Sequence, residues 1–197
     1  MNLAFLATNS GTSMRAIVAA IDAGELAATP VLIVSNKRES GALAFARERA
    51  IAHQHIPTIK DEAGADEALC AALKDARADL VILSGYLRKL GPQTLAAFQG
   101  RILNTHPALL PKYGGQGFYG RRVHEAVIAA GERETGATIH VVDEEYDHGP
   151  VIAQHIIPID SVDDAESIER KVTAAEPGFF VQTLKRIASA EIVLQKP

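Results

Sequence analysis

Short apolar runs alternate with longer amphipathic stretches through the first half of the chain. Four of these runs, rich in Val, Ile and Leu, are nearly continuous, as expected of strands buried on both faces. They predict strands at Asn2–Ala7, Pro30–Ser35, Leu80–Ser84 and Ile102–Thr105. The amphipathic stretches between them predict helices at Met14–Ala23, Ala42–Ala50, Ala65–Ala76 and Pro92–Phe98. Such alternation is typical of a parallel sheet with helices on its faces.

After Gly120 the regular alternation of strand and helix patterns ends. The later elements predicted are a helix at Arg122–Ala130, strands at Ala137–Val142 and Val151–Ile157, and a long amphipathic segment at Ala165–Ser189. No internal repeat, low-complexity tract or linker divides the chain. We therefore expect an α/β fold with a largely parallel central sheet and a mixed C-terminal part, in a single domain that spans residues 1–197.

Composition and charge narrow the classes of protein that the chain can represent. With 197 residues and 47% hydrophobic content, the chain can bury a sizeable core, which excludes a disordered or fibrous protein. Its net charge of -4 comes from intermixed acids and bases, so we expect no nucleic acid partner. The single cysteine, Cys70, lies among helix-forming residues and suits a reducing cytosol. The apolar run at the N-terminus is too short for a signal peptide or membrane span, so we expect a cytoplasmic protein without a membrane partner.

The loop after the first predicted strand, ATNSGTSMRAI, carries candidate chemistry. It leads into a helix, where free backbone amides and the helix dipole favour an anion such as phosphate, near Gly11, Thr12 and Ser13. It is neither a Walker loop nor a dinucleotide fingerprint, because the required lysine and further glycines are missing. Taken alone, the loop fits an ordinary helix cap at Thr12 or Ser13 better than a ligand site.

The stretch RILNTHPALLPKYGGQGFYG, residues 101–120, places two polar side chains at the end of a predicted strand. Alternate residues of a strand share a face, so Asn104 and His106 point the same way. Strand ends are where open α/β sheets bind ligands, and an amide beside an imidazole can stabilise the oxyanion of acyl transfer. A structural histidine before a proline-rich turn is the equally good alternative.

A third group could join that pair. In VVDEEYDHGPVI, Asp147 stands at a turn before a strand, and a carboxylate that reached His106 would favour the charged imidazolium. Asp before His-Gly-Pro is more often only a turn former. The pair His53 and His55 shares a face only if extended and has no third ligand at a recognisable spacing, so we expect no metal site.

The motif Asn104-Thr105-His106-Pro107-Ala108-Leu109-Leu110-Pro111, followed by Asp147-His148-Gly149-Pro150, resembles the signature of the formyltransferases that use 10-formyltetrahydrofolate. Further segments resemble the members that formylate phosphoribosylglycinamide (GAR) in purine biosynthesis: FLATNSGTSM, VSNKRESGALAFA, LVILSGYLRKLGP, GATIHVVDEEYDHGPVIAQ and VTAAE. The resemblance covers nearly the whole chain and implies a Rossmann-like formyltransferase fold. It implies small-molecule substrates, no metal, and a monomer or homodimer.

Site residues follow from the resemblance, position by position. It implies a catalytic trio of Asn104, His106 and Asp147, with direct attack of the substrate amine on the formyl carbon and stabilisation of the oxyanion by His106 and Asn104. For GAR it implies Gly11, Thr12 and Ser13 on the phosphate, Glu176 on the ribose, and Thr173, Ala174 and Ala175 beside it. For the folate it implies Leu87, Arg88, Lys89, Leu90, Asn104, Asp143, Glu144, Glu145, Tyr146 and Asp147. It also implies that His140 lines the site. Without the resemblance, Leu87 and Leu90 fit core packing, and Asp143–Glu145 fits a solvated acidic turn.

Several positions depart from the family pattern. Ser13 replaces an Asn, Asn9 replaces a Gly, and Lys89 stands where an apolar residue is usual along the folate cleft. The loop Gly114–Gly120 is longer and richer in glycine, and Pro177 follows the ribose-binding Glu, where it could perturb the backbone. Three alternatives therefore stay open: transfer to another phosphorylated or nucleotide-linked amine, hydrolysis of 10-formyltetrahydrofolate, and a noncatalytic ligand-binding protein.

Overall fold

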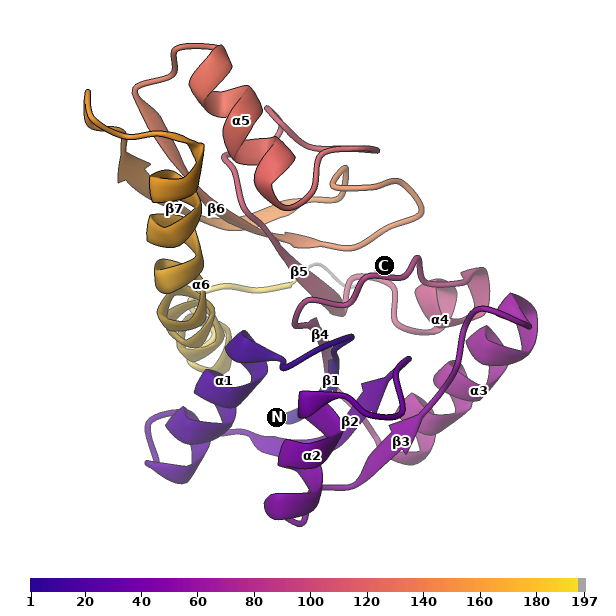
Figure 1. The fold of residues 1–197 in the computed structure, drawn as a ribbon. Helices are drawn as coiled ribbons and strands as arrows, with labels where there is room; N and C mark the ends of the chain where they lie inside the picture. Colours follow the sequence, from indigo (N-terminus) through magenta and orange to yellow (C-terminus); the bar gives the residue numbers. More distant parts are fainter. Residues whose placement is uncertain (195–197) are drawn as a thin grey trace.

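The structure of the protein is a computed structural model that describes residues 1–194. The last three residues of the predicted 1–197 domain lie outside the described residues. Within residues 1–194, seven strands form one sheet in the order β3-β2-β1-β4-β5-β6-β7 (Figure 1). The strands are β1 (Asn2–Leu6), β2 (Thr29–Ser35), β3 (His53–His55), β4 (Leu80–Leu83), β5 (Ile102–His106), β6 (Glu134–Val141) and β7 (Val151–Pro158).

The sheet is parallel from β3 to β5 and antiparallel beyond. β1 pairs in parallel with β2 and β4, β2 with β3, and β4 with β5. β6 then pairs antiparallel with both β5 and β7. The near-continuous apolar runs thus lie in the buried parallel part, while β7, at the edge, is largely exposed. The predicted parallel sheet with a mixed C-terminal part is therefore the observed arrangement.

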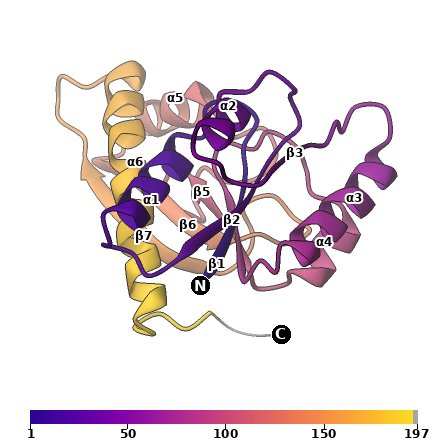
Figure 2. The ribbon, with the colours of Figure 1, turned by 90° about the horizontal axis from the view of Figure 1, so that it is seen from below.

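Helices cover both faces of the sheet (Figures 1 and 2). They are α1 (Thr12–Asp22), α2 (Gly41–Glu48), α3 (Glu62–Asp75), α4 (Pro92–Ala97), α5 (Arg121–Ala129) and α6 (Ala165–Ala188). α1, α2 and α6 pack on one face through a core that includes Phe5, Met14 and Phe180. α3 and α4 pack on the other through Leu73 and their neighbours. α5 packs against α6.

Each predicted helix and strand is present, with ends that differ by a few residues. The strand that the apolar pattern missed is β3, which is three residues long and polar. It forms because Ile33, Val34 and Ser35 of β2 offer a parallel ladder to His53, Gln54 and His55. Because the pairing uses backbone groups only, it needs no apolar side chains, and the apolar pattern could not predict β3.

Backbone contacts tie together the loops at the carboxyl ends of β1 and β4, the two strands where the order of the sheet reverses direction. Leu87 N–H donates to Thr8 Oγ1 over 2.8 Å, and Thr8 N–H donates to the carbonyl of Gly85 over 3.1 Å. Met14 N–H in the first turn of α1 donates to Ser84 Oγ over 3.0 Å. Such a reversal point is where open α/β sheets hold ligands.

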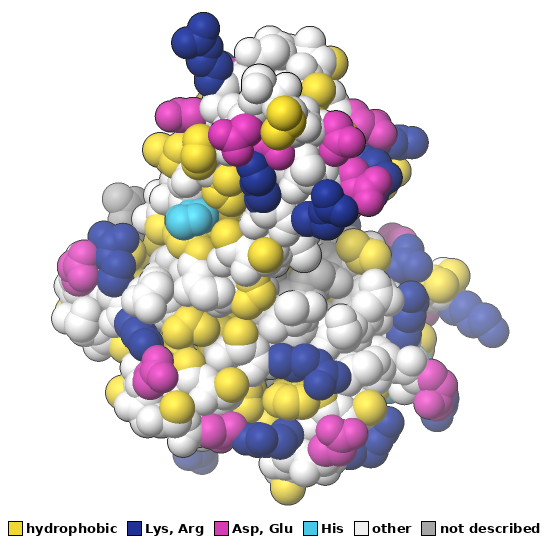
Figure 3. Space-filling model, turned by 60° about the vertical axis from the view of Figure 1, so that its left-hand side comes forward, with side chains coloured by type: hydrophobic (Ala, Val, Ile, Leu, Met, Phe, Trp, Pro, Cys, Tyr) yellow, Lys and Arg dark blue, Asp and Glu magenta, His cyan; other side chains and the backbone are white. Residues whose placement is uncertain are grey.

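Acidic and basic side chains are intermixed over the face that Figure 3 shows. No helix within residues 1–194, the 24-residue α6 included, is both long enough and apolar enough to cross a bilayer.

Candidate active site

His106 is the last residue of β5 and is 3% exposed. Its Nδ1 lies 3.2 Å from Asp147 Oδ2, and its Nε2 lies 2.7 Å from the carbonyl oxygen of Tyr113. Both ring nitrogens thus face acceptor oxygens, an arrangement that only the doubly protonated imidazolium satisfies on both sides. The Tyr113 carbonyl accepts a hydrogen bond from Nε2–H, and Nδ1 is therefore the ring nitrogen that faces Asp147.

The carboxylate of Asp147 lies among donors. Oδ2 accepts from Gly115 N–H over 3.0 Å, and Oδ1 lies 3.5 Å from His140 Nε2. Burial alone would raise the pKa of Asp147, but the hydrogen bond and the charge of His106, with the Gly115 N–H, outweigh it, and the pKa lies well below its ordinary value. Asp147 is therefore ionised at neutral pH. The turn before β7, in which Asp147 has a left-handed φ of 56°, directs this charge at His106.

Asn104, two residues before His106 on β5, joins the same cluster through His140. Its Nδ2 lies 3.2 Å from His140 Nε2, and His140 Nδ1 lies 3.0 Å from the carbonyl of Val141. Since that carbonyl can only accept, His140 carries its proton on Nδ1, and its Nε2 accepts from the Asn104 amide. One N–H of the amide remains free for a ligand. The structure therefore brings the predicted trio of Asn104, His106 and Asp147 together, with the predicted His140 linking two of them.

The predicted phosphate loop lies at the N-terminus of α1, where no side chain caps the helix. Gly11 is the N-cap of α1 with a φ of 66° and no side-chain cap, so the alternative of a cap at Thr12 or Ser13 is wrong. The left-handed φ favours glycine at this position, whereas the atom nearest to an added Cβ, Met14 Cε at 2.9 Å, is the end of a flexible side chain. Asn9, which replaces a glycine of the family pattern, accepts from Lys37 Nζ over 2.8 Å and anchors the loop.

The predicted ribose-binding segment lies in the middle of α6, on the side of His106. Burial raises the pKa of Glu176 to about 7, although the nearby charge of His106 lowers it in part. Thr173 and Ala174 are exposed and line a hollow of about 460 Å³ between α5 and α6. Ala175 instead is partly buried and packs against the cluster of Ala137, Ile157 and Val172. Pro177 does not end α6, but its missing N–H removes one helical hydrogen bond beside Glu176.

The two predicted folate segments meet at a cation–π contact. Lys89 Nζ lies 5.6 Å from the ring centroid of Tyr146, and Leu87 and Tyr146 are 66% and 51% exposed. Core packing is thus wrong for Leu87 and correct for Leu90, which is buried.

The acidic turn beside Tyr146 is exposed at Glu144 and Glu145, as a solvated turn would be, and Asp143 makes hydrogen bonds within it. Asp143 accepts from Glu145 N–H over 2.9 Å, and its Oδ2 lies 3.1 Å from His148 Nδ1. Asp143, Glu144 and Glu145 line a second hollow, of about 790 Å³, whose lining does not include Leu87–Leu90. The two folate segments thus touch through Lys89 and Tyr146 without sharing that hollow.

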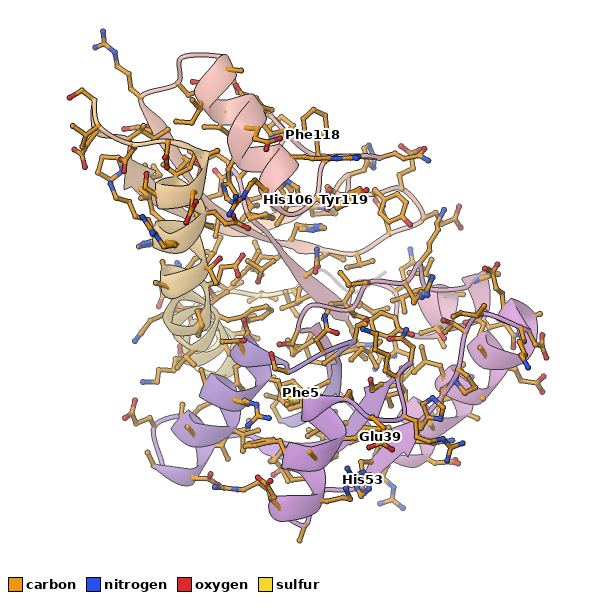
Figure 4. The ribbon with its side chains drawn as sticks, in the orientation of Figure 1. Phe5, Glu39, His53, His106, Phe118 and Tyr119 are labelled. Atoms are coloured by element: carbon orange, nitrogen blue, oxygen red, sulfur yellow. The ribbon has the colours of Figure 1, made fainter. Side chains whose placement is uncertain are left out.

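The histidine pair of β3 is extended, as a shared face requires. Figure 4 shows His53 at the end of the molecule remote from His106, Phe118 and Tyr119. Across residues 1–194, no three side chains of His, Cys, Asp or Glu are grouped so that they could hold a metal ion.

Two parts of the site are backbone groups, the Tyr113 carbonyl and the Gly115 N–H, and sequence reasoning missed both. A backbone group has no residue-type signature. The only indirect signal was the run of glycines after Tyr113, which indicates a mobile loop but not its contacts with His106 and Asp147.

Comparisons with known proteins add a second line of support. The chain matches the formyl transferase family over residues 1–184. It is 37% identical to the chloroplastic phosphoribosylglycinamide formyltransferase of Vigna unguiculata, over 98% of this chain and 63% of that one, so it spans less than two thirds of that relative. It is 31% identical to phosphoribosylglycinamide formyltransferase of Haemophilus influenzae, over 98% of this chain and 90% of that one. The crystal structure of phosphoribosylglycinamide formyltransferase from Bacillus halodurans superimposes with a TM-score of 0.86 at 32% identity, over 96% of both chains.

Proposed function

The chain belongs to the formyl transferase family, and on that premise we propose that it transfers the formyl group of 10-formyltetrahydrofolate to the amine of 5′-phosphoribosylglycinamide in purine biosynthesis. The names of the Vigna unguiculata and Haemophilus influenzae relatives support this acceptor. The observation that carries the proposal is the cluster at the end of β5, in which Asn104, His106 and Asp147 converge.

The proposed reaction begins with attack of the acceptor amine on the formyl carbon. A C–N bond forms, and the carbonyl oxygen becomes an oxyanion that accepts hydrogen bonds from the Asn104 amide and from His106. The bond from the formyl carbon to the folate nitrogen then breaks, and that nitrogen takes a proton as tetrahydrofolate leaves. The proton on the folate nitrogen comes from the His106 imidazolium, and the proton lost by the amine is relayed by Asp147, directly or through water, to His106, so that the carboxylate and the imidazolium are both restored.

The charges of Asp147 and His106 favour these roles. The carboxylate of Asp147 stays ionised and holds the His106 imidazolium opposite it. The imidazolium therefore stands in place before the oxyanion forms, and little reorganisation is needed during the reaction.

The two substrates are proposed to lie on either side of this cluster. GAR would place its phosphate on Gly11, Thr12 and Ser13 and its ribose on Glu176, beside Thr173–Ala175. The folate would lie against Leu87–Leu90 and Asp143–Asp147, where Lys89 and Tyr146 already meet. The proposal is completed by a cytoplasmic location, a single domain, a monomeric or homodimeric state, and a reaction that needs no metal.

One observation favours a second acceptor class. Phe118 and Tyr119, labelled in Figure 4, are 38% and 62% exposed, and Phe118 contacts Tyr113, whose carbonyl lies 2.7 Å from His106 Nε2, so the loop Gly114–Gly120 can offer aromatic surface to an acceptor. A nucleotide-linked amine, which has a base to stack, would use such surface better than GAR.

Release of tetrahydrofolate from 10-formyltetrahydrofolate, followed by absorbance with and without GAR, tests the proposal. We expect release that requires GAR and that falls by about 10²–10³-fold or more in His106→Ala. Release without any acceptor would indicate hydrolysis instead. Release only with a nucleotide-linked amine would establish the second acceptor class, and a lack of release with every acceptor would contradict both.

A further inference from the structure

Glu132 follows α5, in the turn that leads to β6, and makes contacts that none of the predicted site residues share. Its Oε1 accepts from the hydroxyl of Tyr113 over 2.8 Å and from Lys112 Nζ over 2.8 Å. The side chain is 28% exposed, so the carboxylate lies at the surface but is partly covered. Glu132 thereby links Lys112 and Tyr113, which precede the loop Gly114–Gly120, to the turn that follows the C-terminus of α5.

Tyr113 connects this carboxylate to His106. Its hydroxyl donates to Glu132, and its carbonyl accepts from His106 Nε2 over 2.7 Å. Tyr113 also has a φ of 59°, a left-handed conformation that is common for glycine but uncommon for a bulky residue. Such a conformation persists only where the surroundings impose it. The hydrogen bond to Glu132 and the edge contact with Phe118, at 6.4 Å between ring centroids, supply that constraint.

We propose that Glu132 is a positioning residue for His106, acting through Tyr113. Glu132 fixes the Tyr113 side chain, the side chain holds the left-handed backbone, and the backbone carbonyl binds Nε2 of His106. With Nε2 engaged, Nδ1 is the nitrogen that faces Asp147. The catalytic consequence rests on the proposed function, whereas the effect on the ring of His106 does not.

Lys112 provides a matched control within the same cluster. It bonds to the same Oε1 of Glu132, but its side chain is 68% exposed and it makes no contact with His106 in the described structure. Lys112→Met removes the ion pair while it leaves the bond from Tyr113 to Glu132 in place. An effect of Glu132 on His106 should therefore be insensitive to Lys112.

The kinetic part of the test compares Tyr113→Phe, Glu132→Ala, Glu132→Gln and Lys112→Met. We expect Tyr113→Phe and Glu132→Ala to lower kcat by about 10-fold with KM changed by less than about 2-fold, because a misplaced ring affects the transition state more than binding. Glu132→Gln, which keeps an oxygen to accept from Tyr113, should recover most of the loss. The double variant Tyr113→Phe with Glu132→Ala should lose no more than either single variant.

The structural part needs no substrate. In ¹⁵N-histidine-labelled protein, the Nε2–H of His106 should be visible and slow to exchange with solvent in the wild type and in Lys112→Met. In Tyr113→Phe and Glu132→Ala we expect faster exchange and a shift of both ring nitrogen signals. His106→Ala assigns the signals.

The two readouts separate the inference from the proposed function. If the wild type transfers no formyl group to GAR but the His106 signals respond as expected, the positioning stands and the assigned reaction fails. If Tyr113→Phe and Glu132→Ala leave the His106 signals unchanged, the inference is overturned, whatever the activity. Equal effects of Lys112→Met and Glu132→Ala would also overturn it, because the surface ion pair would then be responsible.

Discussion

The ionised carboxylate of Asp147 sets the charge of the residues around it. Because its pKa lies below the ordinary value, Asp147 adds stability at pH values above that value, and this stability is lost as the pH falls through the lowered pKa. Asn is nearly isosteric and tolerates the left-handed φ of 56° at this position. Asp147→Asn therefore removes the charge and keeps the turn.

For Asp147→Asn we predict a kcat lower by about 10²–10³-fold. We also predict a free energy of unfolding lower by about 1–2 kcal/mol at pH 7, with a difference from the wild type that closes as the pH falls below 4. Denaturant titrations between pH 3 and pH 7 check the stability, and the tetrahydrofolate assay checks kcat. A difference in stability that stayed constant over this pH range would contradict the linkage.

Glu176 shows the opposite shift, with a pKa raised to about 7 by burial. The folded state then holds a proton that the unfolded state releases above the ordinary value of 4.5, so stability declines as the pH rises from 4.5 to 7. Glu176→Gln should not show this decline. We predict that the variant gains about 1–2 kcal/mol on the wild type between pH 4 and pH 8, as urea unfolding would measure.

The same substitution should weaken binding of the substrate, because an amide offers one oxygen to the ribose hydroxyls where a carboxylate offers two. We expect a KM for GAR about 10-fold higher at pH 8, with kcat changed little. An unchanged KM would remove Glu176 from the proposed ribose site and leave its effect on stability intact.

Thr138 links elements rather than single side chains. It stands on β6 opposite His106 of β5 and is fully buried. Its hydroxyl donates to the carbonyl of Ala108 over 2.6 Å and accepts from Leu110 N–H and Gln154 Nε2, each over 3.0 Å. The segment that leaves β5 is thereby tied to both β6 and β7, which fixes the end of the strand that carries His106.

We predict that Thr138→Val destabilises the protein by about 2–4 kcal/mol, since the buried Leu110 N–H and Ala108 carbonyl lose their partner. Thr135→Val is the matched control, because Thr135 lies on the same strand, is 1% exposed, and its hydroxyl has no partner in the described structure. That variant should be neutral or slightly stabilising. Chemical unfolding of both variants provides the comparison, and equal losses would mean that bulk rather than hydrogen bonding accounts for the effect.

The predictability of the elements follows from their hydrophobic patterns. β1, β2, β4 and β5 are buried on both faces and gave continuous apolar runs, and the helices gave amphipathic ones, so their existence was predicted. β3 was missed because its three residues are polar and form a strand only through β2. The fold and the family that the sequence predicted are confirmed by the match to the Bacillus halodurans structure and to the family over residues 1–184.

At the scale of the whole molecule, the site unites residues that are far apart in the sequence. His106 meets Asp147, 41 positions later, and Asn104 meets His140, 36 positions later. The spacing of Asn104 and His106 on one strand could be predicted from the period of a strand. The approach of Asp147 could not, because it depends on the antiparallel pairing of β6 and β7. Only the family resemblance suggested it.

Since the proposed ligand sites draw on the loops after β1, β4 and β5 and on α6, a bound substrate would join parts of the fold that unfold together. A ligand that binds only the folded state stabilises it by about 2.7 kcal/mol at 100 times its Kd. For a chain of this size, each kcal/mol raises Tm by about 2–4 °C. We therefore predict that saturating GAR raises Tm by about 5–10 °C in a thermal unfolding scan.

The shift in Tm should be retained in His106→Ala, in which chemistry is lost while the phosphate and ribose contacts remain. It should be reduced in Glu176→Gln by the same interaction that raises the KM. Inorganic phosphate at the same concentration should give a smaller shift, since it reaches only the loop at Gly11–Ser13. A full shift with phosphate alone would mean that this loop accounts for the whole binding energy, and that the contacts proposed on α6 contribute nothing to recognition of the acceptor.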